Sequence, residues 1–543
     1  MAELKKPVKW VILAAGNQYT RQDTGFFDSD TPKTKNIIIQ TEPNRRFSSH
    51  RPADNSVFGK VYRDAWLEGA LLSPPGGEIT VRYIAVDIGS SFVKSALLDP
   101  GTQRIVAIRK ESAPERLPAS NPHLYEIPAA RFVDMYVDHI RHHLAHGGDI
   151  GGILLSTQMH GFIYRTGGED RYVSWQDMRC LDPLPGRSLT GLEALRELLP
   201  TSAMLKTGVD LKPSLGLCNL YSMLEANPTL PRDGTLFTLG SYILHKLTGN
   251  NVCHITNAAP WGMVDVAAGE WERSILAKTA LSDIELPKIA GSDLEVCGNI
   301  SIAGCELPVY PDYGDQQTAV LGCLAGEKDA VINIATAAQV VTFASVFSPG
   351  RCEVRPYFDR QYINTVSNMP GGRGLDVLIR FLTRTVEEIA GIRPPNEAVW
   401  KAALASPDGG SDSLSVDTCF YPVPGNLNGG CISGIRPDNL TLAHIFDAAF
   451  SDMADAYWRH IRSLGPTEEI TRLVCSGGTA WKIPPLLDAI RKTAGRECIL
   501  SPIPDECMSG LHRLALVCAG ICRNIGETAA MPLRKNQSPT TAQ

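Results

Sequence analysis

The chain lacks the patterns that mark several large classes of protein. No Gly-x-Gly-x-x-Gly stretch follows an apolar strand, so a dinucleotide-binding fold is not indicated. The 14 cysteines are scattered, with no Cys-x-x-Cys pair and no Cys/His cluster at zinc spacing, which favours reduced thiols in a cytoplasmic protein. No apolar run approaches the roughly 20 residues that span a bilayer. We therefore expect neither a disulfide framework nor a membrane protein.

The chain also lacks a strong excess of charge of either sign. Lys plus Arg number 52 against 58 Asp plus Glu, a formal net charge of −6, so neither nucleic acid nor an anionic membrane is an expected partner. Hydrophobic residues make up 43% of 543 positions, enough to bury more than one core.

An apolar stretch, Tyr83–Val86, ends in Asp87 and a turn, and a second strand follows without an intervening helix. Gly89 permits a tight turn, while Ser90 and Ser91 offer hydroxyl and amide donors. Asp87 leaves a carboxylate at the strand end, where a hydrated metal ion could bind. The pattern indicates a hairpin that holds the terminal phosphates of a nucleotide; the alternative is an ordinary polar turn.

Two further segments carry side chains suited to sugar recognition. Met159 and His160 follow the strand predicted at 153–156, and strand exits in open α/β sheets face the ligand crevice. Trp175 can cover a sugar face and Asp177 can accept hydrogen bonds from hydroxyls. Met and His are also common in cores, and Asp177 could merely pair with Arg179 at the surface.

Asp315 is the candidate general base. It follows Gly314 and precedes an apolar helical run, and a carboxylate in hydrogen-bond reach of an alcohol can accept its proton during phosphoryl transfer. The alternative is that Asp315 is the N-cap of that helix, a role that is compatible with the first.

These segments resemble, in the same order, the motifs of the FGGY carbohydrate kinases, a branch of the sugar-kinase, actin and heat-shock-chaperone ATPase superfamily. The resemblance spans residues 81–525 and includes a Gly-rich turn at Cys475–Ala480 and a second phosphate motif around Thr336, where Ala335 replaces the usual glycine. It implies an α/β fold of two ribonuclease-H-like, actin-like ATPase domains with an interdomain cleft. If the turn needs positive φ, Ala335 would be strained.

The resemblance also assigns roles to residues. Asp315 would be catalytic, and Asp87 and Asp315 would hold Mg²⁺ through water. Sugar-binding residues would be Met159, His160, Trp175, Asp177 and Gln316. ATP- and phosphate-binding residues would be Gly89, Ser90, Ser91, Lys94, Thr336, Gly477 and Gly478.

We predict four parts of the chain. Residues 17–60 are polar and irregular, and we expect residues 1–80 to form a poorly ordered extension. Residues 81–327 would form a sugar-binding domain, 328–525 a nucleotide-binding domain, and 526–543 a flexible tail.

The predicted function is ATP-dependent phosphorylation of a hydroxyl of a small sugar. The segments around Trp175 and Asp315 are most similar to those of kinases that act on sedoheptulose, so a ketose is favoured; xylulose, ribulose and glycerol stay open. A non-catalytic sugar or nucleotide sensor on the same fold is the alternative from a different class, and a homodimer is left open.

Overall fold

The computed structural model describes residues 81–405, 414–421, 429–531 and 533. The predicted N-terminal extension, residues 1–80, lies outside the described residues. Within the described part of the chain, none of the helices combines the length and the apolar character needed to cross a membrane.

The first half of the chain builds a six-stranded mixed sheet around the predicted hairpin. Its strands, in spatial order, are β13 (Gly298–Ile302), β14 (Cys305–Gly314), β5 (Ile150–Thr157), β1 (Arg82–Ile88), β2 (Phe92–Asp99) and β3 (Arg104–Ser112). β1, β2 and β3 form an antiparallel meander, and β5 and β14 run parallel to β1. The predicted strand–turn–strand at the start of the sheet is confirmed, with the Gly89 amide donating to the Phe92 carbonyl at 3.0 Å.

The second half repeats this topology. Its sheet has the order β17 (Glu353–Pro356), β18 (Tyr362–Met369), β16 (Ala338–Ala344), β15 (Asp329–Ile334), β21 (Arg472–Ser476) and β22 (Glu497–Leu500). β15, β16 and β18 form the antiparallel meander, while β21 and β22 run parallel to β15. The chain thus contains two ribonuclease-H-like units, as predicted.

Two helices lie between the sheets and join them. One buried core combines Ala85 of β1 and Val331 of β15 with Val320 of α9 (Asp315–Gly322) and Leu511 of α15 (Glu506–Cys518). The glycines at the helix crossing allow close contact, since a Cβ at Gly322 would lie 1.9 Å from the Glu506 carbonyl oxygen. The strands of the first sheet end before residue 327 and those of the second begin after residue 328. The later helix α15 nevertheless packs against strands of the first sheet.

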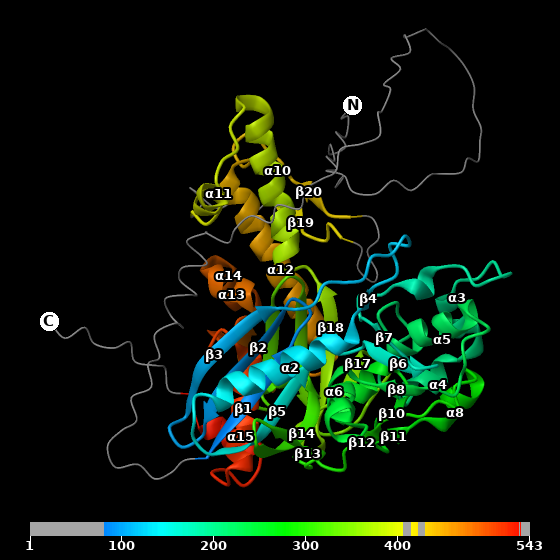
Figure 1. Ribbon diagram of the computed structural model, residues 1–543. Coiled ribbons are helices and arrows are strands. Elements are labelled where there is room, and N and C mark those ends of the chain that lie inside the picture. The colour runs from blue at the N-terminus through cyan, green and yellow to red at the C-terminus, as the bar shows by residue number, and fades with distance from the viewer. Residues whose placement is uncertain (1–80, 406–413, 422–428, 532, 534–543) are drawn as a thin grey trace.

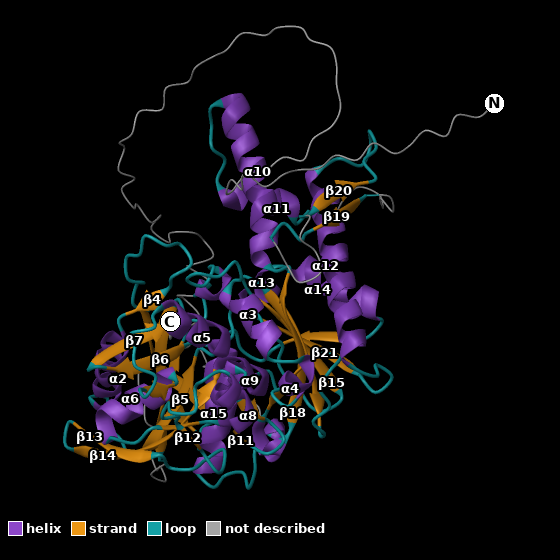
Figure 2. Ribbon diagram, turned by 90° about the vertical axis from the view of Figure 1, so that its right-hand side faces the viewer, coloured by secondary structure: helices purple, strands orange, loops and turns teal. Residues whose placement is uncertain are grey.

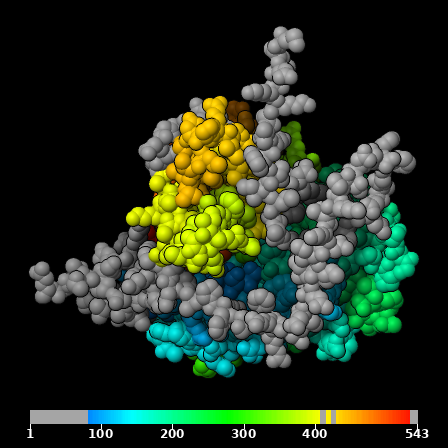
Figure 3. Space-filling view, turned by 90° about the horizontal axis from the view of Figure 1, so that it is seen from above, coloured from blue at the N-terminus to red at the C-terminus, as the bar shows by residue number. Residues whose placement is uncertain are grey.

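Other helices cover the outer faces of the two sheets (Figures 1 and 2). α2 (Ala129–Leu144) and α6 (Leu239–Thr248) bury Phe132 and Ile243 against β1 and β5. α12 (Leu442–Leu464) and α14 (Pro484–Ala494) cover the second sheet, and α10 (Gly372–Ala390) and α11 (Asn396–Ala403) project beyond it (Figure 2). Viewed from above, dark blue atoms of the beginning of the described chain lie in a recess between the yellow and green parts (Figure 3).

Smaller elements complete the fold. A four-stranded sheet is made of β4 (Glu126–Ile127), β7 (Glu169–Val173), β6 (Phe162–Thr166) and β8 (Thr235–Phe237). The remaining elements are η1 (Arg179–Leu181), α3 (Gly191–Leu198), α4 (Thr201–Leu205), α5 (Gly216–Ala226), β9 (Val252–Cys253), α7 (Ile255–Ala258), η2 (Ala259–Trp261), β10 (Val264–Asp265), β11 (Glu270–Trp271), α8 (Arg273–Lys278), β12 (Lys288–Ile289), η3 (Phe358–Arg360), β19 (Ser415–Asp417), β20 (Cys431–Ser433), α13 (Gly478–Lys482) and η4 (Gly526–Ala530).

The start of the predicted flexible tail is folded. η4 occupies residues 526–530, and Thr528 is fully buried, where its hydroxyl accepts a hydrogen bond from Arg513 of α15 at 2.6 Å. This polar contact and the buried Ile525 hold the segment, and one apolar residue leaves no periodic pattern in the sequence.

Candidate active site

A lysine and two carboxylates meet at the end of β1. Asp87, 4% exposed, faces Lys94 across the hairpin, with Lys94 Nζ 3.2 Å from Asp87 Oδ2. Lys94 also donates to Asp505 Oδ2 at 2.9 Å, and Asp505 is the N-cap of α15. Among the described residues, Asp87 Oδ1 finds no hydrogen-bond partner. The site therefore holds a buried carboxylate oxygen that remains available to a ligand.

Asp315 is close enough to Asp87 for their charges to interact. Burial raises the pKa of Asp315 to about 7, and the repulsion of the Asp87 carboxylate acts in the same direction. Asp315 is the first residue of α9, and Gly314 occupies the N-cap position, so the N-cap interpretation of Asp315 is wrong. Its Oδ1 accepts a hydrogen bond from the Gln316 amide at 2.8 Å, which holds the carboxylate at the helix start.

Met159 packs directly against the turn that carries Asp315. A Cβ added to Gly314 would lie 2.5 Å from Met159 Sδ, so glycine is needed for this approach. His160 follows at φ 66°, a left-handed conformation that is unusual for a residue other than glycine. Burial, then the nearby Arg355 and Lys212, lower the pKa of His160 well below its usual value. The structure thus places Met159 against the residue before Asp315, and the surroundings of His160 favour its neutral ring.

The carboxylate of Asp177 hydrogen-bonds to the protein, whereas a sugar ligand would need an oxygen that faces the cleft. Its carboxylate is fully buried and accepts from Arg179 Nε at 2.8 Å and from Arg179 Nη2 at 2.7 Å. The backbone amides of Tyr125 and Arg179 donate to the same oxygens. Four donors leave the carboxylate no exposed oxygen, so Asp177 holds the loop that carries the half-buried Trp175.

Gln316 is likewise occupied by protein contacts. Its amide nitrogen lies 3.1 Å from both Gln339 Oε1 and Thr365 Oγ1, and Arg355 donates to its carbonyl oxygen. Arg355 also donates to Glu353 Oε2 at 2.7 Å. The predicted sugar contact of Gln316 therefore competes with hydrogen bonds from the second sheet.

Lys212 completes this network from the first half of the chain through an ion pair with Glu353. Sequence reasoning missed Arg355, Glu353, Lys212 and Asp505. Arg355, Glu353 and Lys212 follow no motif in the sequence. Asp505 does carry a local signal, because it precedes an apolar helical run and Asp is common at helix N-caps.

The predicted phosphate-binding residues lie on two turns. Gly89, Ser90 and Ser91 form the exposed tip of the β1–β2 hairpin. Thr336 is exposed on the corresponding β15–β16 turn, where the neighbouring Ala335 has no positive φ, so the expected strain is absent.

The Gly-rich turn lies beside a cavity of about 350 Å³. Gly477 has φ 85°, and a Cβ there would lie 2.6 Å from the Ile334 carbonyl oxygen, which explains the need for glycine. Gly478 begins α13. Thr336, Thr479, Asp376, Lys482 and Trp400 line the cavity, which combines polar groups with one flat aromatic wall.

Comparisons with known proteins agree with this architecture. Residues 82–322 match the family model "FGGY family of carbohydrate kinases, N-terminal domain". Sedoheptulokinase from Homo sapiens is 24% identical over 353 residues, which cover 56% of this chain and 70% of the human protein. The mouse sedoheptulokinase is 23% identical, and the chain spans about half of it (54%). A glycerol kinase from Agrobacterium fabrum is 26% identical, covering 44% of this chain and 49% of that protein.

Solved structures show the same fold. The ligand-bound xylulose kinase from Lactobacillus acidophilus has a TM-score of 0.71 at 16% identity, over 84% of this chain and 93% of that one. Plasmodium falciparum glycerol kinase with ADP has a TM-score of 0.68, also at 16% identity, over 84% and 93%. The paired domains and the match to this family define a carbohydrate kinase with the actin-like ATPase fold. Residues 82–322, which include the first six-stranded sheet, thus resemble the N-terminal domain of the FGGY carbohydrate kinases.

Proposed function

We propose that the protein transfers the γ-phosphoryl group of ATP to a hydroxyl of a small ketose, with sedoheptulose as the favoured substrate. The observation that carries the proposal is the position of Asp315, which shares a site with Asp87 and Lys94 and packs beside Met159. The similarity to two sedoheptulokinases supports the choice of sugar.

Asp315 would act as the general base. As the sugar oxygen bonds to the γ-phosphorus and ADP leaves, the hydroxyl proton would pass to the Asp315 carboxylate. Its pKa of about 7 suits this role, because at neutral pH a large fraction is ionised and yet basic enough to accept a proton.

Met159 and His160 would position the sugar, and Trp175 would cover one of its faces. The neutral His160 ring can both donate and accept hydrogen bonds from hydroxyls, and its Nδ1 has no partner among the described residues. Nucleotide phosphates would lie between the hairpin tip of Gly89–Ser91 and the turn of Thr336, with the adenosine in the cavity beside Gly477 and Gly478.

The donor set also fits Mg²⁺, since the buried Asp87 Oδ1 is a hard oxygen ligand without a protein partner. Asp87 and Asp315 would hold the hydrated ion through water. When bound, the ion would offset the charge of the β- and γ-phosphates. Burial raises the pKa of Asp87, and the Lys94 ammonium opposes that rise because it favours the carboxylate form.

A panel assay tests the proposal. ADP release is measured at fixed Mg²⁺ and ATP with sedoheptulose, xylulose, ribulose, glycerol or no sugar. We expect sugar-dependent ADP release with the highest kcat/KM for sedoheptulose. A preference for glycerol would contradict the ketose assignment alone. ATP binding with no turnover on any sugar would favour the sensor and contradict the enzyme.

A further inference from the structure

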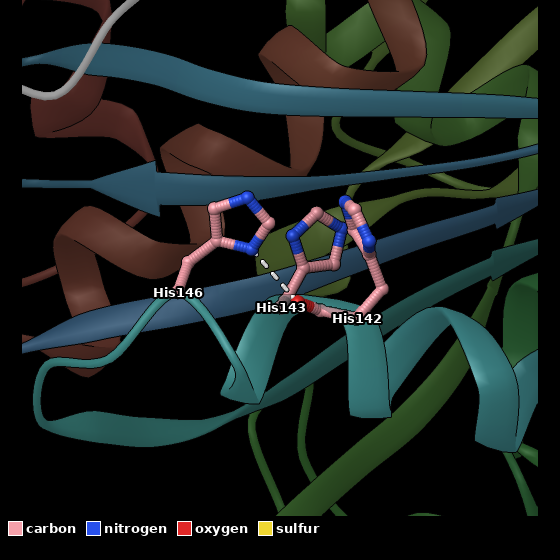
Figure 4. Close-up of side chains that lie close together, drawn as sticks. All are labelled: His142, His143 and His146. Atoms are coloured by element: carbon pink, nitrogen blue, oxygen red, sulfur yellow. Dashed lines mark hydrogen bonds between the residues drawn. The ribbon is translucent and has the colours of Figure 1, made fainter.

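A cluster of histidines lies at the C-terminal end of α2, outside the candidate active site. One ring nitrogen from each of His142, His143 and His146 lies within 4.8 Å of the others (Figure 4). His142 and His146 are exposed and His143 is buried. The i, i+4 spacing of His142 and His146 places both on one side of the helical turn, a spacing that suits a shared metal ion. The cysteine-based zinc patterns considered for the sequence could not reveal it.

Ser95 links two of the buried histidines. Its hydroxyl lies 2.7 Å from His139 Nδ1 and 2.7 Å from His143 Nε2, so it can donate to one ring and accept from the other. When His143 Nε2 donates to Ser95, His143 Nδ1 carries the lone pair that a metal ion would bind.

That nitrogen is also without a partner. His143 is 0% exposed, and among the described residues its Nδ1 makes no hydrogen bond. A buried polar atom without a partner costs about 1–3 kcal/mol, so such atoms call for an explanation. A bound cation between the three rings would supply the missing interaction.

A hydrogen bond also fixes which ring nitrogen of His146 carries a lone pair. Its Nδ1 lies 2.8 Å from the carbonyl oxygen of His142 (dashed line in Figure 4). Because a carbonyl only accepts, the proton is on Nδ1 and Nε2 keeps its lone pair. The His146 amide donates to the His143 carbonyl at 3.1 Å, so the turn that carries His146 is itself held in place.

The surrounding charges tolerate a cation. The guanidinium of Arg109, on the adjoining strand β3, is paired with Asp138 at 2.6 Å and with Glu111 at 3.1 Å. The C-terminal end of a helix also carries a partial negative charge that favours a cation.

We propose that His142, His143 and His146 bind one divalent transition-metal ion, with zinc the best match. Three neutral imidazoles and one water would complete the tetrahedral coordination that zinc prefers, and the Ser95 hydroxyl provides an outer hydrogen bond that orients His143. The ion would tie the end of α2 to β2 and β3. Its role is structural, because Ser95 faces α2 whereas the neighbouring Lys94 faces Asp87 and Asp505.

Zinc titration calorimetry on the full-length chain tests the proposal. The protein is prepared without a polyhistidine tag, with its thiols reduced. We compare the wild type with His142→Ala and His146→Ala, both at exposed positions, and with His460→Ala on α12 as the matched control. We expect one Zn²⁺ per chain that depends on the cluster, with an affinity at least about 10-fold weaker in the two cluster variants and unchanged in the control.

Thermal unfolding supplies a second measurement. Zn²⁺ should raise the melting temperature of the wild type and of His460→Ala by stabilising the folded state, and should do so much less for His142→Ala. Equal melting temperatures in EDTA show that the variants fold. Equal Zn²⁺ affinity in the wild type and both cluster variants, or no binding to the wild type, would overturn the proposal.

Discussion

The buried carboxylate of Asp315 lowers the stability of the folded protein when it is ionised, the form in which it could accept a proton. Its pKa of about 7 lies above the ordinary 3.8, so the folded protein binds more protons than the unfolded chain between these values. Stability therefore falls as pH rises through this range. We predict that Asp315→Asn raises the melting temperature above about pH 7 and that the difference narrows toward about pH 4.

The measurement is thermal unfolding across this pH range without nucleotide or metal. Asp438→Asn, at an exposed position, serves as the matched control and should leave the melting temperature nearly unchanged. A folded Asp315→Asn variant that melts at or below the wild type at about pH 8 would contradict the account, since burial and Asp87 would then impose no cost on the charged Asp315.

His160 gives a second prediction at the residue scale. Asparagine tolerates the left-handed conformation that His160 adopts, so His160→Asn removes the ring with little backbone strain. We expect the KM for the ketose to rise roughly 10-fold or more, with a much smaller change in the KM for ATP. Steady-state kinetics with each substrate varied in turn checks this, and equal effects on both substrates would argue against a sugar-specific role.

Individual side chains divide into those that sequence can place and those that it cannot. Asp87, Asp315 and Met159 follow strands, so their meeting at one edge of a sheet could be predicted from the order of motifs. Arg355 and Asp505 could not, because their contacts depend on how the second sheet and α15 return to the first. The motif around Trp175 predicts a sugar contact for Asp177, whereas the burial of its ion pair with Arg179 becomes visible only in the folded chain.

At the scale of elements, a charged network links β17 with the loop before α5. Lys212 pairs with Glu353 and both side chains are largely buried, whereas Lys288 and Glu295 form a comparable pair in which Lys288 is 65% exposed. We predict that Lys212→Met destabilises the protein by about 1–3 kcal/mol, because it leaves a buried carboxylate with one partner fewer.

The matched variant Lys288→Met should cost much less stability than Lys212→Met, as expected for a surface ion pair. Denaturant unfolding of both variants gives the comparison. Equal losses of stability would show that the Lys212 pair contributes no more than a surface contact.

Element boundaries were predictable where local signals agreed. Apolar residues at helical spacing, among them Phe132 and Ile140, meet the sheet in α2, so this helix follows from its sequence pattern. The run at Thr235–Leu247, which also has helical character, is instead β8 followed by α6. Thr235–Phe237 pairs with β6, and Thr238 then caps α6 by accepting from the Ser241 amide at 3.1 Å. Strand pairing thus outweighs the local helical pattern.

At the scale of the whole molecule, the duplicated topology could be predicted because five motifs occur in order along the chain. The placement of α9 and α15 between the sheets could not, since their contacts join residues nearly 200 positions apart in sequence, as in the hydrogen bond from Ser509 to the Gly322 carbonyl (|i−j| of 187).

The described fold begins at residue 81, and β1 begins at Arg82. We predict that a chain starting at Val81 keeps the melting temperature and the ATP turnover of the full-length protein, measured at the same Mg²⁺ and sugar concentrations. A large loss of either would show that residues 1–80 dock on the kinase and contribute to it.

In the proposed reaction, Asp315 accepts the proton of the sugar hydroxyl during phosphoryl transfer. The steady-state turnover of Asp315→Asn is measured with the preferred ketose and saturating Mg²⁺ and ATP, beside calorimetric binding of both substrates. We predict a kcat lowered by about 10²-fold or more with sugar binding retained, because the amide cannot accept the proton. Turnover close to that of the wild type in the folded variant would show that Asp315 is not the base.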